Sequence, residues 1–302
     1  MEQDYGFSGL LSSVGLQPTD AKPKPAFLKR FCGFHKPEEM PSGLYSGPFL
    51  DSVLARFGFV YAVMEISIHS LLEGATRATG TVAVIDVFRA FTTAAVAMAN
   101  GASRIVMVRS VEEALALREA GVGQICMGEV RGRAPPGFDY ANSPFEISSV
   151  DLHGKTIIQR TSAGTQGIVE AATRADRLYA ASLVTAEATV QALLSGSPDQ
   201  ISLVAMGDNG IKRTDEDELC AMHLRNRLEG RSGDPDSIRR LIRAGGEVGR
   251  FHDPARPYLH PEDIVIALDI DRYDFAVRVE FENGRPVARI ETPAVTMPKS
   301  PT

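Results

Sequence analysis

Residues that could do chemistry first occur at the end of an apolar run, Thr81–Asp86, in the segment IDVFRAFTT. The run ends on Asp86, and a carboxylate at the carboxyl end of a buried strand could bind a hard cation. Arg89 follows at the start of a helical pattern, where its guanidinium and the first backbone N–H groups of the helix could hold a phosphate. The alternative is structural, with Asp86 capping the helix and Arg89 in solvent. This segment fits both interpretations equally.

A second candidate is the turn Gly128–Arg133, which follows another short apolar run. Glu129 could bind a metal ion there, while Arg131 could neutralise an oxyanion. Charged turn residues are commonly only solvated, so the turn carries little weight when it is taken alone. It opens a long loop, Arg131–Pro144, and a loop of this length between regular elements is often functional.

Further along the same loop, the segment GFDYANSP offers oxygen ligands and a hydroxyl donor. The residues concerned are Asp139, Asn142 and Ser143, on a turn that is braced by proline. Turn chemistry alone favours the same residue types and is the simpler explanation when no other segment is considered.

The segment RTSAGT joins a predicted buried strand to a predicted helix. Its small hydroxyl-bearing residues and its glycine could cradle a phosphate at the start of that helix. The spacing and the lysine of a Walker loop are absent, and ordinary helix capping is the alternative. The candidate residues are Arg160, Thr161, Gly164 and Thr165.

An acidic run, Asp215–Glu218, opens the helical pattern that follows the turn MGDNG. The helix dipole favours negative charge in a first turn, but four acidic residues exceed what capping requires and could include a Mg²⁺ ligand. We expect Cys220 in the same pattern to pack as a small apolar side chain. The sequence has no HExxH and no GxSxG motif, which disfavours zinc catalysis and a serine hydrolase.

The scaffold for these residues follows from apolar runs that alternate with helical patterns from Met64 onward, beginning with MEISIHSLL. Runs such as TVAVID and SLVAM predict strands that are buried on both faces of a sheet. We therefore expect a layered α/β/α fold with mostly buried strands. The predicted strands are Thr81–Asp86, Arg104–Val108, Gln124–Met127, Lys155–Gln159, Arg177–Ala181 and Ile201–Ala205, and the predicted helices are Ala90–Asn100, Val111–Ala120, Gly164–Thr173, Thr185–Leu194 and Asp236–Ala244. The final apolar runs are Ile264–Ile270, Ala276–Phe281 and Arg285–Ile290, the last two separated by the hairpin signal Asn283-Gly284.

The chain also carries a weak internal repeat with an offset of 73 residues. Segment 84–105 lies over segment 157–178 without gaps and is identical at seven positions. Each copy has the pattern of a strand, a polar turn, a small-residue helix and a second strand. This predicts two similar halves from an internal duplication, about 64–150 and 151–291, although alanine-rich helices also match one another by chance.

Composition limits what the chain could bind. The 302 residues carry 32 Lys+Arg against 38 Asp+Glu, a net charge of −6, which argues against a nucleic-acid binder. An anionic substrate would therefore need a local basic pocket or a metal ion. The three cysteines form no CxxC pair, the start has no signal-peptide pattern, and no apolar stretch is long enough to span a bilayer. We expect a reduced, cytoplasmic protein with no membrane role.

The two ends of the chain differ in composition from the rest. Residues 1–63 are rich in Pro, Gly and Lys without a sustained period, which predicts a flexible extension or a mis-annotated start, with the functional protein beginning at Met64. A regulatory extension is the alternative. The tail 292–302 is Pro-rich and is expected to be loose.

Taken in order, the segments IDVFRAFTT, GEVRG, GFDYANSP, RTSAGT, ASLV and EDELCA resemble the motifs of the 2-phosphosulfolactate phosphatase family. The resemblance covers about Met64 to Leu228 and the following part more loosely. It implies an α/β domain of two similar halves, over 64–291. It also implies a Mg²⁺-dependent phosphatase that acts on a sulfonated lactate phosphoester in coenzyme M biosynthesis. The family motif positions fall on Asp86, Arg89, Glu129, Asp139, Asn142, Ser143, Thr161, Gly164, Thr165, Ser182 and Asp217.

The chain departs from the family pattern where contacts to a ligand are expected. The asparagine of the family's TTNGT motif is Ala163 here, and the asparagine of its GSxxN motif is Thr185. Met206 replaces an alanine before the acidic helix, and Met222 replaces a glycine within it. The metal carboxylates therefore match the family better than the expected substrate contacts do.

From the residues and the resemblance together, we expect a phosphomonoesterase in which Asp86, Glu129 and Asp217 share Mg²⁺, directly or through waters. Arg89 would neutralise charge on the phosphoryl oxygens, and Asp139 would orient the attacking water. The substrate and its phosphate would lie against Arg131, Asn142, Ser143, Arg160, Thr161, Gly164, Thr165 and Ser182.

Two alternatives belong to other classes. The first is a family member that binds a small phosphorylated or sulfonated acid without hydrolysing it, as the substitutions at Ala163 and Thr185 suggest. The second is an α/β protein with a purely structural role in an assembly. A homodimer is compatible with each of these interpretations.

Overall fold

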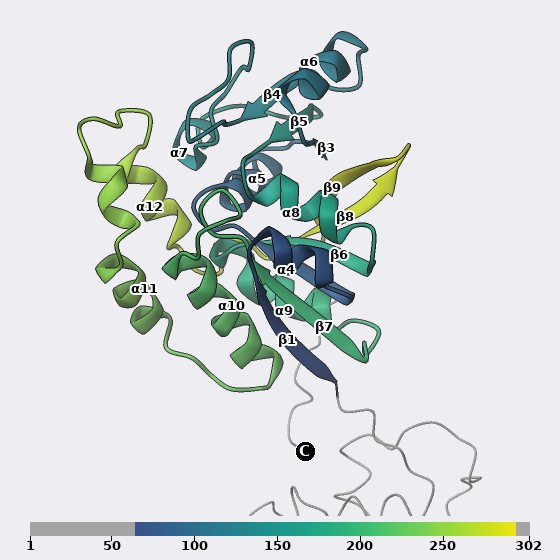
Figure 1. Ribbon diagram of the computed structural model, residues 1–302, viewed down its shortest axis with the longest axis vertical. Helices are drawn as coiled ribbons and strands as arrows, with labels where there is room; N and C mark the ends of the chain where they lie inside the picture. The colour runs from purple at the N-terminus through teal and green to yellow at the C-terminus, as the bar shows by residue number, and fades with distance from the viewer. Residues whose placement is uncertain (1–63, 294–302) are drawn as a thin grey trace, which may run out of the picture. The chain divides into compact units, whose positions relative to one another are not determined.

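One mixed sheet organises the residues that the computed structural model describes, 64–293. Our predictions for 1–63 and for the tail from 294, together with Cys32, lie outside the described residues. The nine strands follow the order β1-β7-β2-β6-β8-β9-β3-β5-β4 (Figure 1). They are β1 (Glu65–Ser70), β2 (Gly80–Ile85), β3 (Arg104–Met107), β4 (Ile125–Gly128), β5 (Thr156–Arg160), β6 (Ala175–Ala181), β7 (Gln200–Ala205), β8 (Ala276–Glu282) and β9 (Arg285–Glu291).

The sheet contains two parallel blocks joined by an antiparallel hairpin. Strands β1, β7, β2 and β6 pair in parallel, as do β3, β5 and β4. The hairpin β8–β9 lies between the blocks and pairs antiparallel with β6 on one side and with β3 on the other. Its turn, Asn283-Gly284, has φ values of 50° and 77°, as a tight hairpin turn requires, so the hairpin prediction is confirmed.

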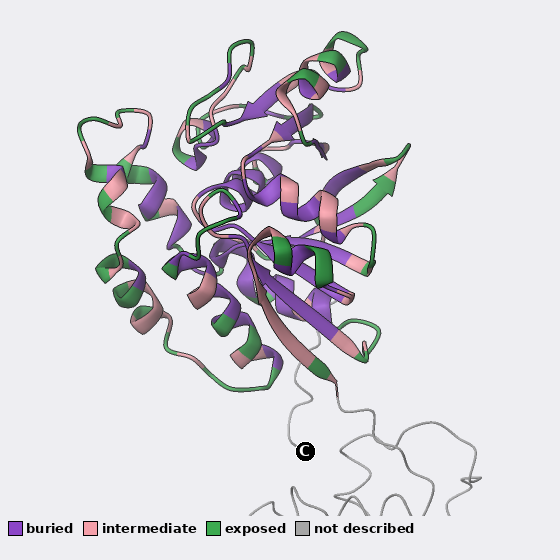
Figure 2. Ribbon diagram, in the orientation of Figure 1, coloured by how far each residue is buried: buried purple, intermediate pink, exposed green. Residues whose placement is uncertain are grey.

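Helices cover both faces of the sheet. On one face, Val82 and Val84 of β2 pack in a single core with residues of α5 and α8, while on the other face Ala83 and Ile85 pack with residues of α9 and α10. Burial of alternate residues on opposite faces confirms the layered α/β/α fold, and Figure 2 shows the central strands as mostly buried. The helices are α4 (Leu71–Arg77), α5 (Ala90–Ala99), α6 (Val111–Glu119), α7 (Pro144–Ile147), α8 (Gly164–Ala171), α9 (Ala186–Leu194), α10 (Asp215–Leu228), α11 (Pro235–Ala244) and α12 (Pro261–Ala267), with short 3₁₀ turns at Leu183–Thr185 and Val248–His252.

Elements match the predicted ones to within two residues at most ends, with two differences. The apolar run Ile264–Ile270 belongs to a helix, α12, which begins at Pro261. Helix α4 follows β1 directly, where the sequence shows one continuous apolar pattern. Cys220 is fully buried in the core as expected, and it and Cys126 are free thiols. No helix among residues 64–293 is both long and apolar enough to cross a membrane.

The two copies of the internal repeat pair with each other. In the first copy β2 leads through α5 to β3, and in the second β5 leads through α8 to β6. Strand β2 pairs with β6, and β3 pairs with β5, so each strand of one copy pairs with a strand of the other copy. This reciprocal arrangement suits a duplication, which itself stays a prediction.

Candidate active site

A cavity of about 370 Å³ opens where four strands end. It is lined by Asp86 after β2, Glu129 after β4, Ser162 after β5 and Gly207 after β7. Further parts of the wall come from Asn142, from Thr214 and Glu216 at the start of α10, and from the segment 247–259. Ligands in α/β proteins bind at the carboxyl ends of strands, and the predicted site segments meet here although they are far apart in the sequence.

Asp86 accepts a hydrogen bond from the start of α5 and also lines the cavity, while Arg89 is buried and not in solvent as the structural alternative had it. Cation binding by Asp86 stays a prediction. Asp86 Oδ1 accepts the N–H of Ala90 at 2.9 Å, and the residue is 6% exposed. Burial raises the pKa of the Asp86 carboxyl to about 6, and the negative charge of Glu129 contributes to the rise. Gly164 lies so close that a Cβ there would be 2.8 Å from Asp86 Oδ2, which explains why this position of the α8 turn is glycine.

Glu129 fastens two turns beneath the cavity. Its Oε1 accepts the N–H of Ser162 at 2.5 Å, and its Oε2 accepts the N–H of Gly132 at 2.6 Å and the hydroxyl of Ser162 at 3.2 Å. The turn after β4 is therefore bonded to the turn after β5. One carboxylate fixes the shape of both turns and leaves its charge at the cavity wall.

The acidic run of α10 contributes a different residue from the predicted one. Asp217 does not line the cavity, because its two oxygens accept the N–H groups of Val87 and Gly207 at 2.7 and 2.8 Å. Burial, together with the carboxylates of Glu216 and Asp86, raises the pKa of Asp217 well above its ordinary value. Asp217 thus ties α10 to the ends of β2 and β7, and its share in holding the metal, directly or through waters, stays a prediction.

Glu216, and not Asp217, is the residue of the acidic run that lines the cavity. It is 4% exposed, and its Oε2 has no hydrogen-bond partner among residues 64–293. Burial raises the pKa of Glu216 to about 7, with further contributions from the charges of Glu247 and Asp86. Four acidic residues in succession cover every side of a helix, so the sequence could not show which of them faces inward.

The oxygen atoms at the cavity suit a hard cation. In the described part of the chain, no three His, Cys, Asp or Glu side chains form a ready-made metal centre, and metal binding by Asp86, Glu129 and Asp217 stays a prediction. However, the buried Oδ1 of Asn142 also lacks a partner within the described residues, and Asn142 lines the cavity beside Asp86 and Glu129. Mg²⁺ is usually bound by one or two carboxylates plus waters and phosphate oxygens. The carboxylates of Asp86 and Glu129 and the amide oxygen of Asn142 are donors of this kind.

Four arginines bring positive charge to the same cavity: Arg89, Arg131, Arg250 and Arg256. Arg89 is 4% exposed and donates from NH2 to the carbonyl of Gly132 at 3.2 Å. Arg250 is held by Glu247 at 2.6 Å. Arg250 and Arg256 could not be predicted as site residues, because they lie in a segment without a motif. The cavity therefore has an acidic and a basic part.

Several predicted phosphate-binding residues support the site and do not line it. Thr161 and Thr165 bond to each other, with the Thr165 N–H donating to Thr161 Oγ at 3.0 Å, and so cap α8. Arg160 donates to the carbonyl of Glu129 and to the Ser162 hydroxyl. Ser143 caps α7 and donates to Asp263 at 2.6 Å. Ser182 is buried behind the cavity, and its hydroxyl has no partner in the range 64–293. Only Arg131 and Asn142 of that predicted group line the cavity, while Gly164 approaches it.

Asp139 also lies away from the cavity, where it was predicted to orient a water. Its Oδ2 accepts the N–H of Cys126 at 2.8 Å and an N–H of Arg118 at 3.1 Å, and Asp139 does not line the cavity. The carboxylate closes the turn that follows the edge strand β4, as turn chemistry alone would require. It is therefore not placed to orient a water at the cavity.

Comparison with known proteins decides the family. A family model described as 2-phosphosulpholactate phosphatase matches residues 66–242, which is more than half of the chain. The chain belongs to this family. A protein of Bacillus subtilis named "Probable 2-phosphosulfolactate phosphatase" is 31% identical over 207 residues, which cover 67% of this chain and 88% of the relative.

Two other relatives in the 2-phosphosulpholactate phosphatase family carry the same printed name. The protein of Thermotoga petrophila is 42% identical over 149 residues, 49% of this chain, and the match spans 63% of that relative's length. The protein of Thermoplasma volcanium is 35% identical over 191 residues, 63% of this chain and 85% of the relative. The matched family region ends at 242, so it does not include the cavity wall 247–259.

The departures from the family motifs do not all reach the cavity. Ala163 lines it, at the cap position of α8. Thr185 is fully buried and contacts Thr189 and the carbonyl of Ser182, while Met222 is 55% exposed on α10. Only the loss of the amide at Ala163 therefore changes the surface that a ligand would meet.

The buried carboxylates predict an unusual pH dependence of stability. Asp86 and Glu216 have raised pKa values, so these two carboxyls hold more protons in the folded state than in the unfolded state between pH 4 and pH 7. His223 opposes them in part, because burial lowers the pKa of its imidazole to about 4. Without a divalent cation, the two carboxyls outweigh the one imidazole, so the free energy of unfolding is expected to fall by roughly 2 kcal/mol as the pH rises from 5 to 8. Urea unfolding in chelator at several pH values measures this. A free energy that rises steadily over that range would contradict it.

Proposed function

We propose that this protein is a Mg²⁺-dependent phosphomonoesterase that acts on a small acidic hydroxy acid. The observation that carries the proposal is one cavity that brings buried oxygen atoms of Asp86, Glu129 and Asn142 together with the side chains of four arginines. A divalent cation and guanidinium groups together suit the charge of a phosphoryl group. Membership of the 2-phosphosulpholactate phosphatase family supports the same activity.

The proposed substrate is 2-phosphosulfolactate, which would give sulfolactate and phosphate in a step of the coenzyme M biosynthesis type. The printed names of the relatives support this choice. A phosphoester with two further acid groups needs several cations, and Arg131, Arg250 and Arg256 line the cavity in addition to Arg89. The free thiols of Cys126 and Cys220 support a reducing compartment, for which we propose the cytoplasm.

In this mechanism, oxygen atoms of Asp86, Glu129 and Asn142 would hold the cation. When bound, Mg²⁺ would neutralise charge on the phosphoryl oxygens and polarise the ester. Arg89 would donate N–H groups to the oxygens on which negative charge develops. Glu216 Oε2 would accept the proton of the attacking water, because a carboxyl with a pKa of about 7 is half deprotonated near neutral pH and is a stronger base than an ordinary glutamate.

One assay tests the proposal. Purified protein is incubated with a panel of phosphorylated 2-hydroxy acids, with Mg²⁺ or with chelator, and released phosphate is measured. We expect release with Mg²⁺ that falls to background in chelator, and the greatest rate for 2-phosphosulfolactate. Release that is unaffected by chelator would contradict the role of the cation.

The second candidate function is binding without hydrolysis, which the loss of the amide at Ala163 favours. It predicts that the ligands raise the thermal midpoint while no phosphate is released. A purely structural protein would show neither effect, so the same panel distinguishes all three.

A further inference from the structure

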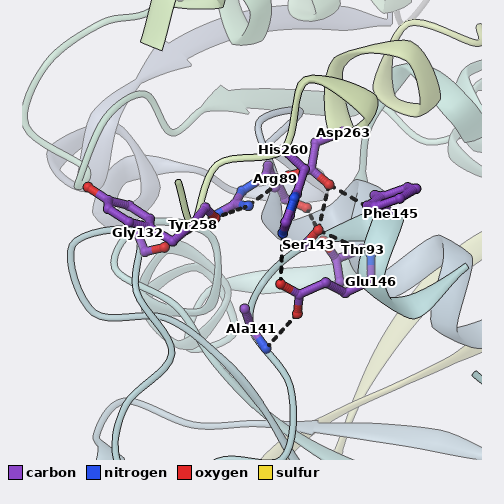
Figure 3. A network of polar contacts seen from close by, with 10 residues as sticks. All are labelled: Arg89, Thr93, Gly132, Ala141, Ser143, Phe145, Glu146, Tyr258, His260 and Asp263. Carbon is purple, nitrogen blue, oxygen red and sulfur yellow. Dashed lines mark hydrogen bonds and ion pairs between the residues drawn. The ribbon is translucent and has the colours of Figure 1, made fainter. Parts of the chain in front are cut away.

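Asp263 is a buried carboxylate at the first turn of α12, outside both the matched family region and the predicted motifs. It has no exposed surface. Its Oδ2 accepts an N–H from Arg89 at 2.7 Å, and its Oδ1 accepts the Ser143 hydroxyl at 2.6 Å and the Phe145 N–H at 3.0 Å. Figure 3 shows Asp263 between Arg89 and the start of α7. Both oxygens of this carboxylate thus accept hydrogen bonds from the described chain.

The guanidinium of Arg89 is held along one edge. Nη1 donates to Asp263 at 2.7 Å and to the Tyr258 carbonyl at 3.5 Å, Nη2 donates to the Gly132 carbonyl at 3.2 Å, and the group lies 5.8 Å from the centre of the Phe251 ring. Its Nε donates to no residue in the range 64–293, while Arg89 lines the cavity. The Nε donor and one N–H of Nη2 therefore remain for a ligand in the cavity.

The burial of both partners makes this pair different from the other ion pairs near the cavity. The side chains of Arg89 and Asp263 are 3% and 0% exposed, whereas those of Arg256 and Asp253 are 40% and 39% exposed. A buried ion pair costs desolvation, and removing one partner leaves an uncompensated charge. Such a pair adds little net stability compared with apolar side chains, so its value lies in fixing where the charge points.

We propose that Asp263 is a positioning residue for Arg89. It holds the guanidinium against the Gly132 carbonyl, so that the free donors stay directed at the phosphoryl group. Ser143 and the Phe145 N–H hold Asp263 in turn, which gives Ser143 an indirect part in a site where the sequence predicted direct contact. The inference rests on the proposed function for its kinetic readout only, because the binding of inorganic phosphate tests it separately.

The test uses the full chain with Asp263→Asn, which keeps the shape of the side chain and removes its charge. We expect kcat to fall about 10- to 100-fold, with a smaller change in KM, as is usual when a supporting group is lost from a reactive site. Asp269→Asn is the matched control, since Asp269 is an exposed aspartate just after α12 that bonds to Arg272. It should retain full activity. A kcat for Asp263→Asn equal to that of this control overturns the proposal.

A double-mutant cycle distinguishes positioning from a merely structural role. If Asp263 acts through Arg89, then Asp263→Asn should change kcat less than threefold in an Arg89→Lys background. If the kcat loss of the double variant equals the product of the losses of the two single variants, the proposal is overturned. Ser143→Ala provides a milder test if Asp263→Asn does not fold. It should lower kcat about three- to tenfold without loss of secondary structure, and an unchanged kcat would count against the proposal.

Binding of inorganic phosphate in the presence of Mg²⁺, measured by calorimetry, separates this inference from the proposed function. Wild-type protein that binds phosphate but hydrolyses no ester would refute the phosphatase, while a tenfold weaker Kd for Asp263→Asn would still support the positioning role. Equal Kd values for wild type and Asp263→Asn would overturn the positioning role.

Discussion

Asp86→Asn is expected to lower Mg²⁺-dependent phosphate release by at least 100-fold while the fold is retained. The amide oxygen can still accept the Ala90 N–H that caps α5, so the helix keeps its start. What is lost is a negative charge in the cavity wall, and with it an oxygen ligand of the kind that Mg²⁺ prefers. Loss of one charge-stabilising group in an active site commonly costs 10²- to 10³-fold in turnover. Steady-state phosphate release at saturating Mg²⁺ measures the change.

The matched control is Asp139→Asn. This residue falls on a family motif as Asp86 does, but its carboxylate accepts the Cys126 N–H on the far side of the β4 turn. We expect activity within about twofold of wild type and a small loss of stability. A loss at Asp139→Asn as large as that at Asp86→Asn would mean that the cavity is not the active site.

Glu216→Gln is expected to reduce turnover by a similar factor and to raise stability at pH 8 without Mg²⁺. The amide cannot accept a proton from water at Oε2, so the rise of kcat with pH near 7 should disappear along with most of the rate. At the same time, a neutral amide replaces a carboxylate whose pKa burial has raised to about 7. The gain is roughly 3 kcal/mol at most above pH 7 and is absent below pH 4, where the carboxyl is protonated in both states.

Glu218→Gln on the same helix is the control for this variant. Its carboxylate accepts bonds from Arg213 and from the Ser70 hydroxyl, and these bonds lower its pKa. The substitution should slightly lower stability at pH 8 and leave kcat nearly unchanged. A lower free energy of unfolding for Glu216→Gln at pH 8 without Mg²⁺ would contradict the inference that the buried, charged carboxylate of Glu216 destabilises the folded state.

The fold could be predicted well because its strands are continuous apolar runs separated by helical patterns, and burial on both faces of a sheet leaves that pattern in the sequence. The first turns of α5 and α8 were found for the same reason, since each follows such a strand. Strand order could not be predicted. Nothing local to β2 shows that it pairs with β6 and β7, about a hundred residues away.

The site could be predicted best where a functional residue follows a strand directly, as Asp86 and Glu129 do, while Asn142 was found through its motif. Within the acidic run, the choice of Glu216 over Asp217 depends on how α10 is rotated against β2, which is a property of packing. Asp263 and Arg250 could not be found from the sequence, because no motif marks either residue: Asp263 reaches the site through a hydrogen bond to Arg89, and Arg250 lines the cavity from the segment 247–259.

The place of the hairpin β8–β9 has a consequence for how the chain reaches its native state. These strands are the last of the described strands to be synthesised, yet they lie in the middle of the sheet and connect its two parallel blocks. On a ribosome, each block can therefore form early, but the two blocks can be joined through the sheet only after residue 291 has been made. Until then β6 and β3 each expose an unpaired edge, and such edges are prone to pair with other chains. Until that stage, the two blocks that carry Asp86 and Glu129 would be joined only through their helices and loops, and not through the sheet.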